Sequence, residues 1–229
     1  GAIEKKSHKV TFHANSLPIL YEIAPPDRVE QILQNVFDQP YANQFVQHRL
    51  PLWKDITAFP YDEDAHVVVA EPFFMHHVNQ TFAKLGRYDL IRRYLQDGWA
   101  KMLDYDATTI WETWDDGGSL CHAWCTTPAY DLAIHCLGVQ IAAPGAEQVV
   151  VAPHPMGLAW AEGAVPTMKG VVQVRWEWDE RTRQFLVQWA ASQGMSIECR
   201  PPEMGGVFPS ETEEMEASGG WAKKIQYTY

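Results

Sequence analysis

The chain has 229 residues, 46% of them apolar and 21% charged, which is enough for one sizeable hydrophobic core or two modest ones. Its 29 acidic and 18 basic residues give a formal charge of −11, which argues against nucleic acid or an anionic membrane as a partner. It contains no apolar run of about 18 residues, so we expect no membrane span. The opening GAIEKKSHKV has no apolar segment typical of a secretory signal, and we expect a cytoplasmic protein.

The first part of the chain predicts helical hairpins. The segment 13–23 carries Leu17, Leu20 and Tyr21 at helical spacing, with Asn15 or Ser16 as the expected cap. A second helix begins at the prolines 25–26 and keeps the same periodicity to residue 37. The two helices are expected to pair.

A region rich in helix-breaking prolines follows, and a second pair of helices is predicted after it. Residues 39–70 contain three prolines, so we expect only a short helical or extended piece at 44–50 and a solvated acidic loop at 61–66. The segment 73–85 is a predicted helix that ends at Gly86 in the left-handed conformation, and 88–103 is its antiparallel partner.

A long loop over 104–127 then leads to a helix predicted over 128–137, with Gly138 as its stop. Helix pairs joined by long loops are typical of an (α/α) barrel, whose ligand site lies where the loops converge. The chain carries helices for about half of such a barrel. The open edge of a half barrel would be apolar, which predicts association there with another polypeptide.

The hydrophobic period changes to that of β-strands after residue 146, with turn residues between the predicted strands. We therefore predict an α + β multidomain fold, a partial (α/α) helical-hairpin barrel followed by a small antiparallel β-sandwich. The expected divisions are 1–143 for the barrel part, 144–202 for the sandwich, and 203–229 for an acidic, turn-rich tail. That tail is expected to be poorly ordered or to wrap around the periphery.

The four cysteines show no spacing that demands disulfides and are interpreted as reduced thiols. Cys121, His122 and Cys125 are close in sequence, but no second cluster completes a tetrahedral metal site. We therefore expect no metal and no cofactor.

The candidate site lies in the long loop. Glu112 stands between Trp111 and Trp114, and His122 follows in the same loop. Indole rings suit the C–H faces of a sugar, while a carboxylate and an imidazole suit its hydroxyls, so the grouping predicts a carbohydrate ligand. The alternative is that both tryptophans are core residues and Glu112 is a solvated loop acid.

Several motifs resemble the C-terminal part of the bacterial α-L-rhamnosidases of glycoside hydrolase family 78, which have a six-hairpin barrel. They are TTIWETW, SLCHAW, PAYDLAIHCLGV and PHPMGLAWAEGAVPTMKGVVQVRW, in the family's order, spanning 108–176. Upstream, HANSLPILYEIAP and FFMHHVNQTFAKLGRYDLIRRYLQDGWAKML extend the resemblance over most of 11–202. The fold that the resemblance implies agrees with the hydrophobic periodicity.

The resemblance implies an inverting hydrolase of terminal α-L-rhamnosides. The glutamate of its WE motif, here Glu112, would be the general base, and its histidine, here His122, would contact a sugar hydroxyl. Trp114 is a weaker candidate for a sugar-facing wall, and Trp111 is equally compatible with core packing. The loop between Glu112 and His122 is shorter than in many members of the family.

The family's general acid lies in the N-terminal half of its barrel, so this chain alone is expected to have little or no activity. A second interpretation is a non-catalytic carbohydrate-binding or interaction module. In that case Trp114 and His122 would be a sugar platform and Glu112 only a hydrogen-bond acceptor. A third interpretation is a structural remnant that binds nothing.

Overall fold

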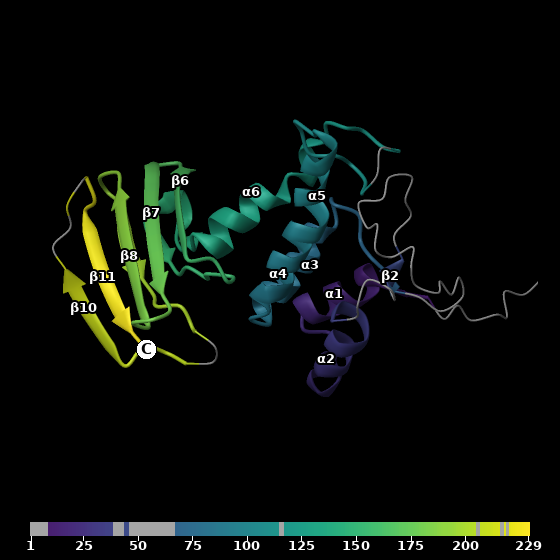
Figure 1. Ribbon diagram of the computed structural model, residues 1–229, viewed down its shortest axis with the longest axis horizontal. Coiled ribbons are helices and arrows are strands. Elements are labelled where there is room, and N and C mark those ends of the chain that lie inside the picture. The colour runs from purple at the N-terminus through teal and green to yellow at the C-terminus, as the bar shows by residue number, and fades with distance from the viewer. Residues whose placement is uncertain are drawn as a thin grey trace, which may run out of the picture. The chain divides into compact units, whose positions relative to one another are not determined.

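The computed structural model of the protein describes residues 9–38, 44–45, 67–114, 117–204, 207–215, 218 and 220–229. The chain divides into two compact units, Gly1–Pro128 and Ala129–Tyr229 (Figure 1). The first unit is mostly helical and the second mostly antiparallel sheet, which confirms the predicted mixture of helices and sheets. Of the piece predicted at 44–50, the structure describes Gln44–Phe45, which are extended, while 46–50 and the loop predicted at 61–66 lie outside the described residues.

The first unit is built from short helices. They are α1 (Phe12–Leu20), α2 (Pro26–Ile32), α3 (Met75–Lys84), α4 (Tyr88–Tyr94) and α5 (Ala100–Met102), with α6 (Thr127–Asp131) at the division between units. π-Helical turns continue α2, α4 and α6 over Leu33–Phe37, Leu95–Trp99 and Leu132–Cys136. Single 3-10 turns lie at Leu103–Tyr105 and Ala123–Cys125, and a third, Pro144–Ala146, lies in the second unit. The short strands β1 (Val10–Thr11), β3 (Val67–Val68) and β2 (Gln44–Phe45) pair in parallel in that order. In the part of the chain described, no helix is long and apolar enough to cross a membrane.

Helix α1 begins earlier and ends earlier than the sequence pattern predicted. Its cap is Thr11, whose hydroxyl accepts a hydrogen bond from the Ala14 N–H at 3.1 Å, so the expectation of Asn15 or Ser16 was wrong. Pro18 lies inside the helix, where it cannot donate a backbone hydrogen bond, and the helix ends at Leu20. The Pro18 carbonyl then accepts from the N–H groups of residues 23 and 24.

Four aromatic rings form the centre of the helical unit. Phe12, Phe37, Phe82 and Tyr94 are all fully buried, and their centroids lie 4.9 to 5.9 Å apart in mostly edge-to-face pairs. They come from α1, the turn after α2, α3 and α4. This cluster holds α1, α3, α4 and the turn after α2 together, and α1 packs chiefly on α3.

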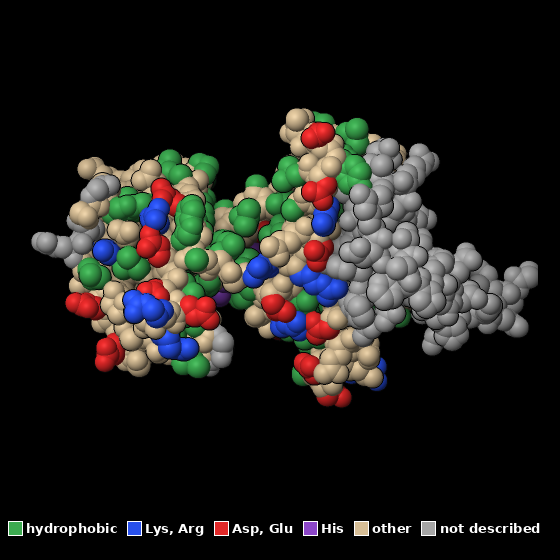
Figure 2. Space-filling view, in the orientation of Figure 1, with side chains coloured by type: hydrophobic (Ala, Val, Ile, Leu, Met, Phe, Trp, Pro, Cys, Tyr) green, Lys and Arg blue, Asp and Glu red, His purple; other side chains and the backbone are tan. Residues whose placement is uncertain are grey.

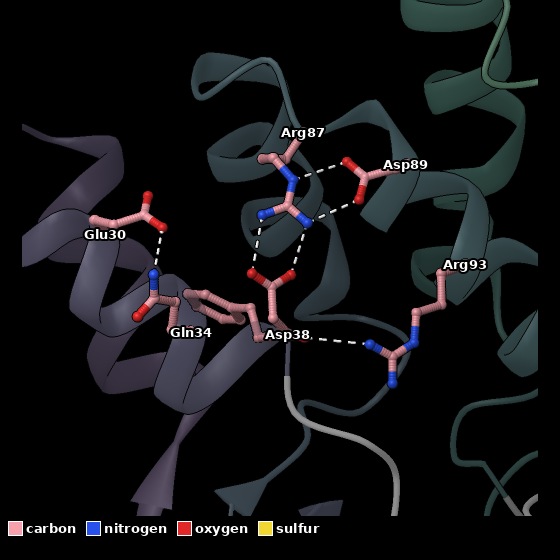
Figure 3. Close-up of polar contacts among 7 residues, drawn as sticks. Glu30, Gln34, Asp38, Arg87, Asp89 and Arg93 are labelled. Atoms are coloured by element: carbon pink, nitrogen blue, oxygen red, sulfur yellow. Dashed lines mark hydrogen bonds and ion pairs between the residues drawn. The ribbon is translucent and has the colours of Figure 1, made fainter.

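A charged cluster joins the α3–α4 turn to the end of the first pair (Figure 3). Arg87 follows Gly86, which has the predicted left-handed conformation with φ 68°. The Arg87 guanidinium donates to both oxygens of Asp38 at 2.6 and 3.0 Å and to both oxygens of Asp89 at 2.7 and 2.8 Å. These bonds raise the pKa of Arg87 and lower that of Asp89.

Replacing Arg87 by methionine should lower the free energy of unfolding of the helical unit by about 1 kcal/mol at low salt, because two carboxylates lose a shared bidentate partner. The loss should shrink in high salt, since the cluster is partly exposed. Urea titrations at two salt concentrations measure both effects. Arg92→Met is the control, because Arg92 bonds only to Gln96 one turn along among the described residues. Equal losses for the two variants would contradict the assignment.

The second unit contains two sheets. The five-stranded antiparallel sheet has the order β10 (Glu211–Met215), β11 (Lys223–Thr228), β8 (Gln184–Ala191), β7 (Gly170–Asp179) and β6 (Trp160–Thr167). The three-stranded sheet has the order β4 (Val139–Ile141), β5 (Gln148–Val151) and β9 (Ser196–Cys199), with β5 and β9 parallel. Both sheets contribute side chains to one core around Trp176, Phe185 and Val149.

The division between units falls before the boundary expected at residue 143. The turn Leu132–Cys136 belongs with the sheets, since the Trp176 indole N–H donates to the Cys136 carbonyl at 2.9 Å and Cys136 is part of the shared core. Gly138 closes this turn with φ 80°, and a Cβ there would lie 2.2 Å from the Ala152 carbonyl carbon. The chain can therefore enter β4 directly only with glycine at this position.

The expectation of a poorly ordered or peripheral tail was wrong for Lys223–Thr228, which form strand β11. Strand β11 pairs with β8 along its whole length, Lys223↔Trp189 to Thr228↔Gln184, and Tyr227 is buried in the core. Strand β10 covers the edge of β11, and its five residues ETEEM are all exposed. Its charges obscured the strand in the sequence, but they suit a sheet edge that faces solvent.

A partly buried histidine in the second unit makes its stability depend on pH. Burial, reinforced by the nearby His135, lowers the pKa of His154 from 6.5 to about 4. As the pH falls from about 6.5, the unfolded chain binds a proton that the folded unit binds only near pH 4. The free energy of unfolding therefore contains the full contribution of His154 above pH 6.5. It decreases by on the order of 2 kcal/mol as the pH falls toward 4. Thermal unfolding across this range should show the decrease, and His154→Gln should flatten it. An unchanged slope in that variant would contradict the assignment.

Candidate functional site

The loop from Asp106 to Thr126 folds back on itself and brings the candidate residues together. The Glu112 N–H donates to the Ser119 carbonyl at 2.8 Å, and the His122 N–H donates to the Ile110 carbonyl at 2.9 Å. The Thr109 hydroxyl also donates to the Leu120 carbonyl. These hydrogen bonds form a ladder between residues 109–112 and 119–122. Glu112 and His122 therefore lie beside each other across the ladder.

A hydrogen bond to one of its two oxygens holds the Glu112 carboxylate in the described part of the loop. Its Oε2 atom accepts a hydrogen bond from the Ser119 N–H at 2.9 Å and lies 3.9 Å from His122 Nδ1. Among the described residues, no group is within hydrogen-bond distance of Oε1. The side chains of Glu112 and His122 are 45% and 33% exposed, so both are open to solvent. One carboxylate oxygen is thus available to a water molecule or a sugar hydroxyl.

Gly118 allows this close approach. A Cβ at residue 118 would lie 2.9 Å from Thr113 Oγ1 and 3.1 Å from Glu112 Oε2, so a larger residue would push the carboxylate aside. The glycine pair 117–118 is visible in the sequence as a turn, but its contact with Glu112 is visible only in the fold.

Trp114 anchors the loop in the helical core. It is 1% exposed, its indole N–H donates to the Ala70 carbonyl at 2.8 Å, and its backbone N–H donates to Glu71 Oε2 at 3.1 Å. Its ring packs edge-to-face on Trp99 at 5.0 Å and lies against Gly98. The structure gives Trp114 a packing role, as the alternative interpretation of the sequence held. Sugar contact by this residue stays a prediction.

Trp111 is also buried, at 5% exposed, and its ring lies 6.3 Å from that of Tyr105. The two tryptophans therefore hold the loop on either side of Glu112, which alone of the three projects to the surface. Sugar contact by Trp111 likewise stays a prediction.

Trp124 is an exposed aromatic residue that the sequence analysis did not single out. It is 72% exposed, and its ring stacks on Phe73 at 5.3 Å with an interplanar angle of 26°. It follows His122 by two residues on the same turn, within the motif SLCHAW. A tryptophan in a loop gives no periodic signal, so sequence alone does not separate this exposed ring from the buried Trp114.

The cysteines next to the site are unpaired thiols. Cys121 is exposed, while Cys125 is buried and lies 3.5 Å from the Glu112 carbonyl oxygen. Burial, together with the charge of Glu112, raises the pKa of the Cys125 thiol to about 11. Within the described ranges, no three His, Cys, Asp or Glu residues are placed to hold a metal ion.

The chain thus consists of a mostly helical unit followed by a β-sheet unit. Residues 138–194 match the family model described as the bacterial alpha-L-rhamnosidase C-terminal domain. A comparison with curated proteins finds no match.

Solved structures agree with the family model. A GH78 family rhamnosidase from Bacillus sp. GL1 is 26% identical over 85% of this chain, with a TM-score of 0.66. An alpha-L-rhamnosidase from Dictyoglumus thermophilum (16% identity, 98% of this chain, TM-score 0.68) shares the fold. An alpha-L-rhamnosidase from Streptomyces avermitilis complexed with L-rhamnose also shares the fold (17% identity, 95% of this chain, TM-score 0.61). The resemblance to the C-terminal part of the bacterial α-L-rhamnosidases is thus confirmed. The chain spans 19%, 26% and 21% of the lengths of these three proteins.

Proposed function

We propose that this chain carries the general base of an inverting α-L-rhamnosidase, and that the base is Glu112. The observation that supports this most directly is the Glu112 carboxylate, which the Ser119 N–H fixes through Oε2 while 45% of the side chain is exposed. A general base needs this combination, because it must be held in place and still accept a proton from water. The similarity to rhamnosidases supports the choice of substrate class.

In the proposed mechanism, Glu112 takes a proton from a water molecule that attacks the anomeric carbon on the face opposite the leaving group. Inversion requires a second carboxyl group roughly 6.5–9.5 Å away to protonate the leaving oxygen. We propose that this acid comes from helical hairpins outside the chain, which complete an (α/α) barrel with the helices of residues 1–143. His122 would donate a hydrogen bond to a sugar hydroxyl next to the base.

The stereochemistry of the product tests this proposal. Hydrolysis of an aryl α-L-rhamnoside by the intact protein should release β-L-rhamnose first, which mutarotation then converts to the mixture of anomers. Proton NMR spectra recorded in the first minutes distinguish the anomers. Initial release of α-L-rhamnose would contradict a base that activates water, since retention requires a nucleophilic carboxylate closer to the acid.

One observation favours a second candidate function, a non-catalytic carbohydrate-binding module. The Ser119 N–H already occupies Glu112 Oε2 and closes the loop, which is what a structural hydrogen-bond acceptor does. In that case Glu112→Gln would change the affinity for methyl α-L-rhamnoside only modestly, and the wild-type protein would bind this sugar without hydrolysing rhamnosides.

Trp124 is proposed as the sugar-stacking residue of this site, because its exposed ring is already ordered by Phe73. Trp124→Ala should raise KM for an aryl α-L-rhamnoside about fivefold, since a stacking contact contributes on the order of 1 kcal/mol. The value of kcat should change little, because the reacting groups remain. Steady-state kinetics measure the two constants, and Leu103→Ala, an exposed apolar residue on the 3-10 turn before the loop, is the control. An unchanged KM would exclude Trp124 from the site.

A further inference from the structure

The five-stranded sheet of the second unit carries a groove on its outward face, with a volume of about 650 Å³. Trp160 of β6 and Trp221, just before β11, line it, together with Glu162, Gln173 and Arg175. All five residues belong to the unit 129–229, so the groove is separate from the loop that holds Glu112. Its size is within the range of pockets that hold small ligands, roughly 300–1,000 Å³.

The alternation of β7 separates the groove from the core. Val172, Val174 and Trp176 are fully buried, so Gln173 and Arg175 point to the opposite face of the sheet. Trp160 is 59% exposed. It pairs with Glu177 at the outer edge of the sheet, next to the pair Glu162↔Arg175. The core of this unit is formed by the inward-facing side chains of the strands. The Trp160 side chain lies on the other face and is not part of that core.

The charges in the groove are fixed and nearly compensated. Arg175 Nη1 lies 2.6 Å from Glu162 Oε2, and Nη2 lies 2.5 Å from Glu177 Oε1. The guanidinium also stands over the Trp160 ring, 5.5 Å from its centroid, which holds the ring in place. Figure 2 shows acidic and basic side chains side by side on the visible surface of this unit. Within the lining the charges of Arg175 and Glu162 balance, and Glu177 beside the groove adds a small negative excess, which disfavours an anionic ligand.

The remaining polar groups of the groove have unused hydrogen-bonding capacity. Across the residues described, the Gln173 side-chain amide and the indole N–H groups of Trp160 and Trp221 make no hydrogen bond. They supply donors and one acceptor beside two aromatic surfaces. Glu162 adds a carboxylate acceptor at the same wall. Neutral donors and acceptors next to exposed indole faces match the hydroxyl edge and C–H face of a pyranose.

We propose that this groove is a second carbohydrate-binding site, which takes a neutral oligosaccharide. The sugar faces stack on Trp160 and Trp221, and hydroxyl groups bond to Gln173 and Glu162. The site and the proposed base belong to different units of the chain. The existence of the site does not depend on the function proposed for Glu112.

Isothermal titration of the full-length protein tests the proposal, with cellotetraose and maltotetraose as neutral probes and tetragalacturonate as the anionic probe. At least one neutral probe should bind in the millimolar range, and tetragalacturonate should bind more weakly. Trp160→Ala and Trp221→Ala should each lower the affinity about tenfold or more. Trp160→Phe should retain part of it. Met168→Ala, an 89% exposed apolar residue in the β6–β7 turn outside the groove, is the matched control and should bind as the wild type does.

Two controls keep this result distinct from the proposed catalytic site. Glu112→Gln should leave binding of the tetrasaccharides unchanged, and Trp160→Ala should leave hydrolysis of a small aryl rhamnoside unchanged. Far-ultraviolet circular dichroism checks that each variant is folded, and Gln173→Ala provides a substitution that removes no aromatic packing. The proposal is overturned if neither neutral probe binds, if tetragalacturonate binds more tightly, or if Trp160→Ala and Gln173→Ala both bind as the wild type does.

Discussion

Glu112→Gln is expected to lower kcat for aryl α-L-rhamnoside hydrolysis about a thousandfold in the intact protein, with KM changed by less than about threefold. The amide keeps the size of the side chain and can still accept the Ser119 N–H, so the loop should keep its conformation. It cannot take a proton from water, so the chemical step is lost while binding remains. Steady-state kinetics and calorimetric titration with methyl α-L-rhamnoside measure the two effects separately.

A matched control sharpens this prediction. Replacing a nearby carboxylate that is not part of the site should have no such effect. Asp104→Asn is the matched control, because Asp104 is an exposed carboxylate ahead of the same loop that pairs only with Lys101 among the described residues. It should retain wild-type kcat. An activity loss shared by both variants would remove Glu112 from the base role.

Trp114→Ala is expected to lower the free energy of unfolding of the helical unit by about 3–5 kcal/mol, the range for deleting a fully buried aromatic side chain. The substitution leaves a cavity beside Gly98 and Trp99 and leaves the Ala70 carbonyl without its indole donor. The loop that carries Glu112 would also lose its anchor. Chemical denaturation followed by circular dichroism measures the change.

Trp124→Ala is the matched control for stability, because it removes the same side chain from an exposed position of the same loop. Its effect should remain below about 1 kcal/mol. If the two variants were equally stable, Trp114 would not be the anchor that its burial indicates. If Trp124→Ala were the more damaging, its stacking on Phe73 would matter more for the fold than its exposure suggests.

The helices were predictable because local chemistry determined them. Pro26 in the first turn of α2, Gly86 after α3 and Gly138 after the turn Leu132–Cys136 all act at short range, and the structure agrees at each. The start of α1 was missed because Thr11 competes with Asn15 and Ser16 as a cap. Only the hydrogen bond from Ala14 to the Thr11 hydroxyl decides among them.

The last strands and the site needed long-range information. Strand β10 is entirely exposed, so it has no hydrophobic alternation, and its existence depends on pairing with β11. In the loop, Trp114 and Trp124 are the same residue type with opposite burial, which only the packing of Gly98 and Phe73 determines. The proximity of Glu112 to His122 depends on the backbone ladder across the loop, which the sequence does not encode as a motif.

The central claim is that Glu112 is the base of a rhamnosidase site whose acid lies outside these residues. The most direct test is hydrolysis of p-nitrophenyl α-L-rhamnoside by the purified 229-residue chain and by the protein isolated from its source, with the intact mass of each. We predict activity in a source polypeptide larger than 26.1 kDa and little or none in the isolated chain. A 26.1 kDa chain that hydrolyses the substrate as fast as the source protein would contradict the claim.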